Sequence, residues 1–423
     1  MEMTLNLKEL VQHKSSAKDL KSKCKEIKER ITPGDVNVKI QSLNGPPVNN
    51  PTFNVLDYAA TANGQTNDSK SFLKAWKDVC EATQDSPTLL IPKNKTFMLQ
   101  PVTFMGECKS STINVKIEGR LIAPRGVIDW KWEGVKKGRW IHFSDIKGLL
   151  VNGRGLMDGQ GAPWWDCFHE SRCKRPDMAL SFRRCENLQL KEPTHINSPA
   201  VHIHLDCCNG AYISNLNIVA PQERSNSTDG IDISTSSNII IQDSNIETGD
   251  DCIAINKGSS LINITGVFCG PGHGISIGSL GPQGSHATVE DIHVRNCTFT
   301  RTSNGARIKT WKGGYGYARK ITFEDITLVE ARKPIIINQY YGGVDEVTAV
   351  EVSDITYRNF KGTSATENAT QLVCDVNRDC TDIVLDQINI TSSQPGKATY
   401  ASCENAHGTS SSSNVPDTDC LKV

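Results

Sequence analysis

From about residue 110 onward, the chain repeats short β-branched runs that are separated by Asn, Asp or Gly. Examples are "IKGLLVNG", "AYISNLNIVA", "SNIIIQDSNIET", "SLINITGVFCG" and "RKITFEDITLVE". Runs of this kind predict short strands, and no convincing helical pattern interrupts them. Hairpin turn signals are missing between the runs, so a β-sandwich is disfavoured.

Matching apolar positions in successive runs lie 26, 23, 30, 29 and 29 residues apart. These positions are Ile213, Ile239, Ile262, Ile292, Ile321 and Val350. A period in this range is typical of a solenoid, whose coils stack ~4.8 Å apart through backbone hydrogen bonds. The pattern therefore predicts an all-β parallel β-helix with an aliphatic ladder inside. Leucine-rich repeats are the second architecture, but their L-x-x-L-x-L phrase is absent.

The start of the chain has a different pattern. Residues 1–52 read as a charged segment and a Pro-, Gly- and Asn-rich linker, either a propeptide remnant or disordered. The repeat domain is expected to span residues 53–423, with a strand-like start at Phe53 to Tyr58. A helix should then begin at Asp68 or Ser69 and cap the first coil. Its apolar face would consist of Phe72, Trp76 and Val79.

The composition of the chain disfavours some classes of function. The net charge is −1 and the pI is about 6.8, whereas a nucleic-acid or anionic-membrane binder would show a basic excess. No apolar stretch approaches the roughly 18 residues that a membrane span needs. Hydrophobic residues make up 37% and aromatic residues only 6%, so the core should be mainly aliphatic.

Fifteen cysteines without a CxxC spacing favour disulfides over zinc sites. Because the cysteine count is odd, at least one thiol stays unpaired in a monomer. Sequons for N-glycosylation occur at Asn67, Asn94, Asn226, Asn263, Asn296, Asn368 and Asn389. Both features favour the secretory pathway, although "MEMTLNLKELVQHKSSAKDL" contains no apolar signal-peptide core. We therefore expect that the start is truncated or wrongly assigned.

Four polar phrases recur at about the length of one coil. "STDGIDI" carries Asp229, "GDDC" carries Asp250 and Asp251, and "GPGHGISIGS" carries His273. The steps from Asp229 to Asp250 and from Asp251 to His273 are 21 and 22 residues. Stacked coils would therefore bring these side chains into one row. "ARIKTW" follows after a coil and a Gly-rich loop.

The adjacent carboxylates need a bend to face the same way, because neighbouring strand residues point to opposite faces. Gly249 makes such a bend cheap. Mutual repulsion among Asp229, Asp250 and Asp251 should keep one carboxyl group protonated while its neighbours stay ionised. An acid beside a base is the requirement of glycosidic bond hydrolysis.

The RIK phrase suggests an anionic substrate. Arg307 and Lys309 share a strand face, and such a pair suits a carboxylate. Gly272 and Gly274 would let a bulky chain approach the backbone beside His273. A sugar polymer with a carboxylate on each unit is a natural substrate.

Each phrase also has a simpler interpretation. GDD alone is commonly an acidic turn or a calcium ligand. GHG alone is commonly a loop with a solvated His, and RIK alone is commonly a solvated strand face. "GRGLMDG" resembles a dinucleotide loop, but no helix is expected after it. Trp164 and Trp165 are expected to pack under a loop. The one-coil spacing of the four phrases together favours catalysis.

The chain from about residue 53 to its end resembles plant polygalacturonases of glycoside hydrolase family 28. "GRGLMDGQGAPWW", "NSPAVHIH", "STDGIDI", "TGDDCIAI", "CGPGHGISIGSLG", "GARIKTW" and "PIIINQYY" occur in the family's order. The resemblance implies a right-handed parallel β-helix with an open cleft. It also implies hydrolysis of α-1,4 bonds in de-esterified pectin with inversion and with no metal or cofactor. The expected enzyme is secreted to the cell wall and monomeric, with wall inhibitor proteins as potential partners.

Roles follow from the same resemblance. Asp250 would be the general acid, Asp229 and Asp251 would hold and deprotonate the water, and His273 would support the acid. Arg307 and Lys309 would bind the galacturonate carboxylate. Tyr341 would be a further substrate contact, with Tyr340 as the alternative register for the tyrosine.

One phrase departs from the family. The usual Asn-Thr-Asp-Gly reads Ser227-Thr228-Asp229-Gly230 here, and Asn226 could take the place of the missing Asn through a bulge. A glycan on Asn226 would sit at the cleft rim. The family pattern also implies the disulfides Cys252–Cys269, Cys374–Cys380, Cys403–Cys420 and Cys80–Cys108, and proximity adds Cys167–Cys173. No partner is assigned to Cys24, Cys185, Cys207, Cys208 and Cys297, several of which are expected to be small buried hydrophobes.

Three alternatives stay open at this stage. The enzyme could hydrolyse a branched pectin such as rhamnogalacturonan. It could be a calcium-dependent lyase on the same fold, or a non-catalytic or weakly active pectin-binding wall protein, which the altered phrase favours. Internal cleavage is preferred over attack from a chain end, but loops decide between them.

Overall fold

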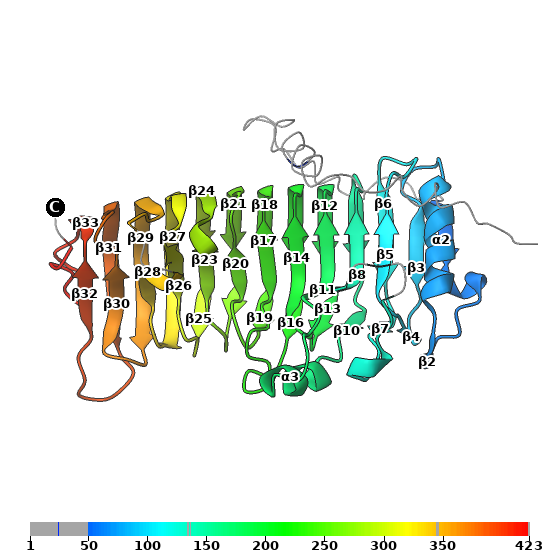
Figure 1. The fold of residues 1–423 in the computed structure, drawn as a ribbon, viewed down its shortest axis with the longest axis horizontal. Helices are drawn as coiled ribbons and strands as arrows, with labels where there is room; N and C mark the ends of the chain where they lie inside the picture. The colour runs from blue at the N-terminus through cyan, green and yellow to red at the C-terminus, as the bar shows by residue number, and fades with distance from the viewer. Residues whose placement is uncertain (1–23, 25–49, 133–134, 136, 344–346, 422–423) are drawn as a thin grey trace, which may run out of the picture.

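In a computed structural model, the described residues are Cys24 and residues 50–132, 135, 137–343 and 347–421. Two parallel sheets run the length of the molecule (Figure 1). The 11-stranded sheet consists of β5 (Val102–Met105), β8 (Arg139–Ser144), β11 (Met178–Arg183), β14 (Val201–Asp206), β17 (Ile231–Ser234), β20 (Ile253–Ile255), β23 (Ile275–Leu280), β26 (Ala306–Lys312), β28 (Ile335–Gly343), β30 (Asn368–Val373) and β32 (Tyr400–Glu404).

The 22-stranded sheet supplies the rest of each coil. Its strands are β1 (Thr52–Asn54), β2 (Asn63–Asn67), β3 (Thr88–Ile91), β4 (Thr96–Met98), β6 (Ile113–Ile117), β7 (Arg120–Ile122), β9 (Leu149–Asn152), β10 (Leu156–Asp158), β12 (Glu186–Lys191), β13 (Thr194–Ile196), β15 (Asn209–Ser214), β16 (Asn217–Val219), β18 (Ser237–Gln242), β19 (Asn245–Glu247), β21 (Ser259–Thr265), β22 (Phe268–Cys269), β24 (His286–Arg295), β25 (Thr298–Thr300), β27 (Tyr315–Ala331), β29 (Glu351–Ser364), β31 (Cys380–Ser392) and β33 (Ala406–Ser410). All inter-strand pairs are parallel and link each coil to the next, so the fold is the predicted parallel β-helix.

Buried aliphatic side chains stack from coil to coil inside the helix. The register links Ile239 to Ile262, Ile262 to Ile292 and Ile292 to Ile321, as the spacing predicts. The two ends of the predicted ladder are wrong. Ala211 pairs with Ile239, and Ile355 pairs with Ile321. The small Ala211 carries little hydrophobic signal in the sequence.

The two misplaced residues belong elsewhere. Ile213 pairs with Ile241, two residues further along the strand. Val350 is fully buried but lies just before β29 begins. For Ile213 the register error is two residues, which leaves the same face buried because a strand alternates its side chains, so the apolar pattern does not reveal it.

The corners of the coils explain why Asn, Asp and Gly recur between the runs. One row of stacked corner residues has a left-handed backbone, with φ between 50° and 60°: Asn187, Asn238, Leu261, Asp291 and Lys320. Gly210 holds the same position one coil after Asn187. Asn, Asp and Gly adopt this conformation at least cost, so the polar residues in the repeat mark bends in each coil.

Helix α2 (Ser69–Glu81) covers the first coil, and it buries Phe72, Trp76 and Val79 as predicted. Asp68 is its N-cap residue, but its carboxylate accepts from the N–H groups of Thr61 and Ala62 and not from the helix. The prediction of a strand up to Tyr58 is wrong in part. After β1, the 3₁₀ helix η2 (Val55–Tyr58) begins, because the side chain of Asn54 accepts from the N–H of Leu56.

A second α-helix was not predicted. Helix α3 (Ala162–His169) follows "GRGLMDG" and buries Trp164 and Trp165, so the expectation that no helix follows is wrong. With a Pro in its first turn and only eight residues, it leaves little periodic signal. Two further 3₁₀ helices complete the elements, η3 (Val127–Asp129) and η4 (Pro282–Gly284). None of the described helices has the length and apolarity to cross a membrane.

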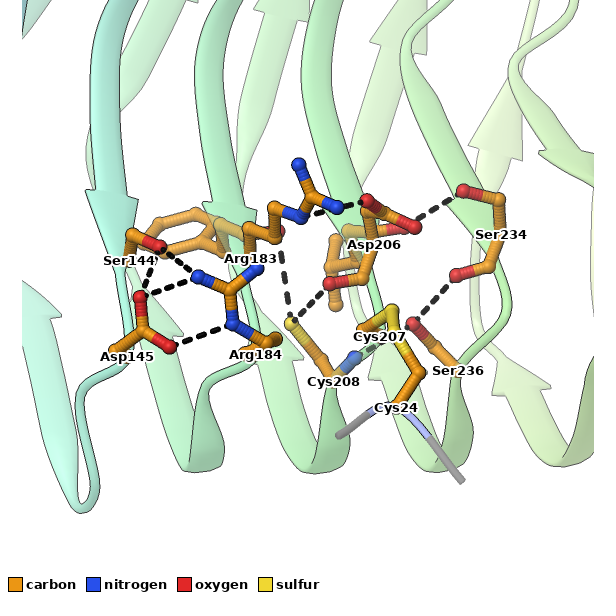
Figure 2. The surroundings of a disulfide bond; sticks show 12 residues. Cys24, Ser144, Asp145, Arg183, Arg184, Asp206, Cys207, Cys208, Ser234 and Ser236 are labelled. Carbon is orange, nitrogen blue, oxygen red and sulfur yellow. Dashed lines mark hydrogen bonds and ion pairs between the residues drawn. A yellow bond between two sulfur atoms is a disulfide. The ribbon is translucent and has the colours of Figure 1, made fainter. Parts of the chain in front are cut away.

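Six disulfides connect the chain. All five predicted pairs form: Cys80–Cys108, Cys167–Cys173, Cys252–Cys269, Cys374–Cys380 and Cys403–Cys420. The sixth, Cys24–Cys207, was not assigned from the sequence, and it joins the N-terminal segment to the end of β14 (Figure 2). Three thiols remain free and buried, as expected of small hydrophobes: Cys185, Cys208 and Cys297.

Coil-to-coil polar contacts surround this sixth disulfide (Figure 2). Arg184 pairs with Asp145, with 2.5 Å between Nε and Oδ1, and the N–H of Cys208 donates to the hydroxyl of Ser236 at 3.0 Å. Residues 1–23 and 25–49 lie outside the described residues, so the predicted charged segment and linker remain a prediction.

Candidate active site

Three of the predicted side chains stack on consecutive coils. Strands β17, β20 and β23 begin at paired isoleucines, and Asp229, Asp251 and His273 each lie two residues before them. The N–H of Asp251 donates to Oδ1 of Asp229 at 3.0 Å. The N–H of His273 donates to the carbonyl of Asp250 at 2.7 Å. The site therefore lies where successive strands of the 11-stranded sheet begin.

The chain bends at residues 249–250, which lets both adjacent carboxyl groups belong to one site. Gly249 is required there by a close approach between coils. A Cβ atom on Gly249 would lie 2.2 Å from the carbonyl oxygen of Ser225, where no side chain fits. The bend that the sequence predicted is therefore held by the neighbouring coil.

Asp251 is buried among donors. Its Oδ2 accepts from Nζ of Lys309 at 2.7 Å, and its Oδ1 accepts from the hydroxyl of Ser276 at 2.9 Å and from the guanidinium of Arg307. Asp251 is 1% exposed, and both cations are 7% exposed. The two cations share one face of β26, as predicted, but in this structure they bind a carboxylate of the protein itself.

Asp250 is the more accessible carboxylate, with 24% of its side chain exposed. Its Oδ1 lies 2.6 Å from Nδ1 of His273. Burial raises the pKa of Asp250. The hydrogen bond and charge of His273, together with Lys309 and Arg307, outweigh burial and hold that pKa below its ordinary value. These groups favour the ionised form of Asp250 beside His273.

The protonated carboxyl group lies one coil earlier. Burial, followed by repulsion from Asp232, Asp250 and Asp251, raises the pKa of Asp229 well above its ordinary value. Burial also raises the pKa of Asp232 to about 7, although a hydrogen bond from Asp229 opposes this. These shifts favour a proton on the Asp229–Asp232 pair, whereas the shift of Asp250 favours its ionised form.

Asp232 was missed by the sequence reasoning. It stands between Ile231 and Ile233, which are both fully buried. Strand alternation therefore places Asp232 on the outer face beside the site. The phrase "DGIDI" contained this signal.

The raised pKa of Asp232 predicts a pH-dependent stability. A buried carboxyl group with a pKa of about 7, against an ordinary 3.8, stabilises the fold fully below pH 3.8 and loses this contribution as the pH rises through 7. We expect the free energy of unfolding to fall across this range, and to fall less in Asp232→Asn. Denaturant unfolding between pH 4 and 8 measures both slopes. Asp243→Asn, at an exposed corner, is the control, and equal slopes in all three proteins would contradict the assignment.

Both candidate tyrosines lie at the end of β28 and are about half exposed. Nζ of Lys309 lies 5.1 Å from the ring centroid of Tyr341. The hydroxyl of Tyr340 accepts from the N–H of Val376 at 3.1 Å, and its ring faces Lys312. Tyr341 is therefore the tyrosine beside the acidic cluster.

In the altered phrase, the side chain of Asn226 is exposed, and its backbone carbonyl accepts from Arg175. Ser227 has φ 67°, in the left-handed region. The amide contact that was expected of Asn226 stays a prediction.

Among the residues that the structure describes, one group has the geometry of a metal site. Ligand atoms of Asp250, Asp251 and His273 lie within 4.8 Å of one another. Both oxygens of Asp251 already accept from Lys309 and Arg307, however, and a metal ion would meet these two fixed positive charges. The donor set fits a cationic metal poorly.

Several carboxyl groups lie together beside two fixed cations on the face of a parallel β-helix. A pair of carboxyl groups that act as acid and base is typical of enzymes that hydrolyse glycosidic bonds. The pattern of "Glycosyl hydrolases family 28" matches residues 80–414. The chain therefore belongs to glycosyl hydrolases family 28 and is a glycoside hydrolase.

Similar proteins agree with this family. A probable polygalacturonase of Arabidopsis thaliana is 48% identical over 380 residues, which cover 88% of this chain and 81% of the relative. A polygalacturonase of Persea americana is 40% identical, with 87% and 80% covered. Among solved structures, the endo-xylogalacturonan hydrolase of Aspergillus tubingensis has a TM-score of 0.73 at 24% identity, with 86% of this chain and 100% of that chain covered. This structural similarity supports the β-helix fold.

Proposed function

We propose that the protein is a polygalacturonase that hydrolyses the α-1,4 bonds between galacturonates in de-esterified pectin. The observation that carries this proposal is the cluster of Asp250, Asp251 and Asp229 against Lys309 and Arg307. Acid, base and anion-binding groups thus lie within one site. The similarity to plant proteins that are named polygalacturonases supports the same substrate class.

Substrate binding begins with the carboxylate of one sugar unit. Lys309 has three N–H donors and uses one on Asp251, so further donors can reach a ligand. The ring of Tyr341 beside this ammonium offers an apolar face to the sugar. Asp251, which also pairs with Arg307, holds Lys309 in place, and this fixes the bound unit relative to Asp250.

Asp250 would be the general acid, and binding of the substrate explains how it gains a proton. Lys309, Arg307 and His273 now hold its pKa down. The carboxylate of a bound galacturonate neutralises Lys309 and Arg307 and brings a negative charge near Asp250. Both effects raise the pKa of Asp250. The hydrogen bond from Nδ1 of His273 is the path by which the proton reaches it.

Asp229 and Asp251 would hold and deprotonate the attacking water on the other side of the bond. To act as a base, Asp229 must first give up the proton that its raised pKa favours. Asp250, whose pKa rises when the substrate binds, is the group that accepts this proton, so the total number of protons in the site stays the same. Attack by water opposite the acid gives inversion at the anomeric carbon. Internal cleavage is the mode we propose.

The disulfides support secretion, and the cell wall is the place where this substrate occurs. We propose that the protein acts there as a monomer, with wall inhibitor proteins as potential partners.

Product analysis tests the function. Wild-type protein and a long polygalacturonate at mildly acidic pH should give new reducing ends without ultraviolet absorbance. Mixed oligomers would indicate internal attack, and monomers would indicate attack from an end. Absorbance from unsaturated products would indicate a lyase. Release only from a branched pectin would indicate the rhamnogalacturonan alternative, and binding without cleavage a pectin-binding wall protein.

Tyr341→Ala should raise KM about tenfold and leave kcat within about threefold, because the lost ring stacks on the bound sugar and takes no part in proton transfer. Steady-state kinetics with oligogalacturonates measure the split. Tyr340→Phe, which removes only the hydroxyl that holds Val376, is the matched control. A fall in kcat without a change in KM would contradict a binding role.

A further inference from the structure

Arg175 lies between α3 and β11 and reaches from there to the loop that carries Asp229. Its Nη2 donates to the carbonyl of Ser227 at 2.8 Å. Its Nη1 donates to the carbonyls of Asn226 at 3.3 Å and Pro199 at 3.4 Å. The guanidinium also lies 4.4 Å from the ring centroid of Phe168. One half-buried side chain therefore joins three segments of the chain.

The segment that presents Arg175 is itself fixed. The disulfide Cys167–Cys173 closes the chain at the end of α3. The next residue after Arg175 is Pro176, which restricts the backbone of Arg175 to extended conformations. Phe168 stacks on the guanidinium from the same helix. The disulfide, Pro176 and Phe168 therefore fix the position of the guanidinium independently of its contact with Ser227.

The loop that Arg175 contacts contains a backbone conformation that is unfavourable in free energy. Ser227 has φ 67°, a conformation in which most residues with a side chain are disfavoured. No other side-chain donor is recorded for the carbonyl of Ser227 in the part of the chain that the structure describes. Arg175 supplies two charge-assisted hydrogen bonds at this turn, which can offset the cost of the conformation.

This turn sets the position of Asp229, two residues later. Thr228 is anchored within the loop, because its hydroxyl donates to the carbonyl of Ser225 at 2.6 Å. The carbonyl of Asp229 accepts from the N–H of His202 at 2.9 Å. Arg175 makes no ion pair with a carboxylate among the described residues, and the charges that act on it include Asp229 and Asp250. Its contacts are with the backbone that leads to Asp229.

We infer that Arg175 is a positioning residue that holds the left-handed turn at Ser227 and thereby orients the carboxyl group of Asp229 toward the reacting bond. The inference rests on the proposed function of Asp229 as part of the base. Arg175 acts through the backbone and needs no contact with the substrate.

Arg175→Gln tests this role. We expect kcat on polygalacturonate to fall about 10- to 100-fold, because a misplaced base loses its approach to the water, while KM stays within about twofold. Arg224→Gln is the matched control, since Arg224 lies in the same loop and pairs with Asp166 at the surface. It should keep kcat within about twofold.

Rescue separates positioning from general stability. Glycine adopts a positive φ without cost, so Ser227→Gly in the Arg175→Gln background should recover most of the lost kcat. Ser227→Gly alone should behave as the wild type. Unchanged kcat in Arg175→Gln, or a loss that Ser227→Gly does not restore, would overturn the inference.

Hydrogen–deuterium exchange gives a readout that does not depend on activity. Arg175→Gln should speed exchange of the amides of residues 226–229, and Ser227→Gly should slow it again. Inactive wild-type protein would refute the proposed function, and the exchange data would then still decide the role of Arg175. Equal exchange in the wild type and in Arg175→Gln would overturn that role even in an active enzyme.

Discussion

Asp250→Asn is expected to lower the release of reducing ends from polygalacturonate at least about 1,000-fold. An amide keeps the shape of the carboxyl group but cannot protonate the leaving oxygen, and general acid–base catalysis supplies roughly this much of the rate. The fold should persist, because the side chain is partly exposed and its main contact is His273. Initial rates at saturating substrate measure the loss.

The matched control is Asp243→Asn, which makes the same change at an exposed corner. It should leave both the rate and the melting temperature unchanged. Retention of a tenth or more of the activity by Asp250→Asn would remove Asp250 from the role of general acid. The pair Asp229 and Asp232, whose pKa values are both raised, would then be the next candidate.

Lys309→Met is expected to lower both stability and activity. The substitution leaves the carboxylate of Asp251 buried with Arg307 as its one remaining cation. Breaking a buried ion pair costs about 3–5 kcal/mol, and we expect a loss at the lower end of that range because Arg307 remains. The ratio kcat/KM should also fall at least about 100-fold, since the substrate carboxylate loses its ammonium partner. Denaturant unfolding and steady-state kinetics measure the two losses.

A second variant separates the two effects. Lys309→Arg keeps a positive charge against Asp251, so it should retain much of the stability, whereas the larger planar guanidinium cannot take the position of the ammonium beside Tyr341, and kcat/KM should still fall at least about tenfold. Lys320→Met, at an exposed pair on β27, is the control and should change neither. Lys309→Met protein with full stability would show that Asp251 does not depend on this ammonium.

The repeat pattern predicted the fold because every coil of a β-helix has the same structural requirements. Each coil must bury an aliphatic row and turn its corners with residues that accept a left-handed backbone, and both demands are visible in the sequence. The exact register was less visible. The interior position of Ala211 gave no strong signal, and Ile213 took its place in the predicted ladder.

The stacking of Asp229, Asp251 and His273 followed from coil length alone. The contacts that these groups make with their neighbours did not follow. A pattern can place Arg307 and Lys309 on one face, but only packing shows that they surround Asp251. The same holds for protonation, because burial decides the pKa of a carboxyl group more than its neighbours in sequence do.

Contacts between distant segments were the least predictable. Arg175 reaches Ser227 across 52 residues, and no local pattern links the two. The disulfide Cys24–Cys207 spans 183 residues, so neither family spacing nor proximity suggested it. Asp232 differs from these contacts, because its alternation with Ile231 and Ile233 in the sequence was sufficient to predict its outward position.

The bond between Cys24 and Cys207 has a consequence for processing of the chain. A protease that cuts between residues 25 and 49 would divide the polypeptide without releasing its front part. The excised piece would stay attached beside β14 until a reductant opened the disulfide.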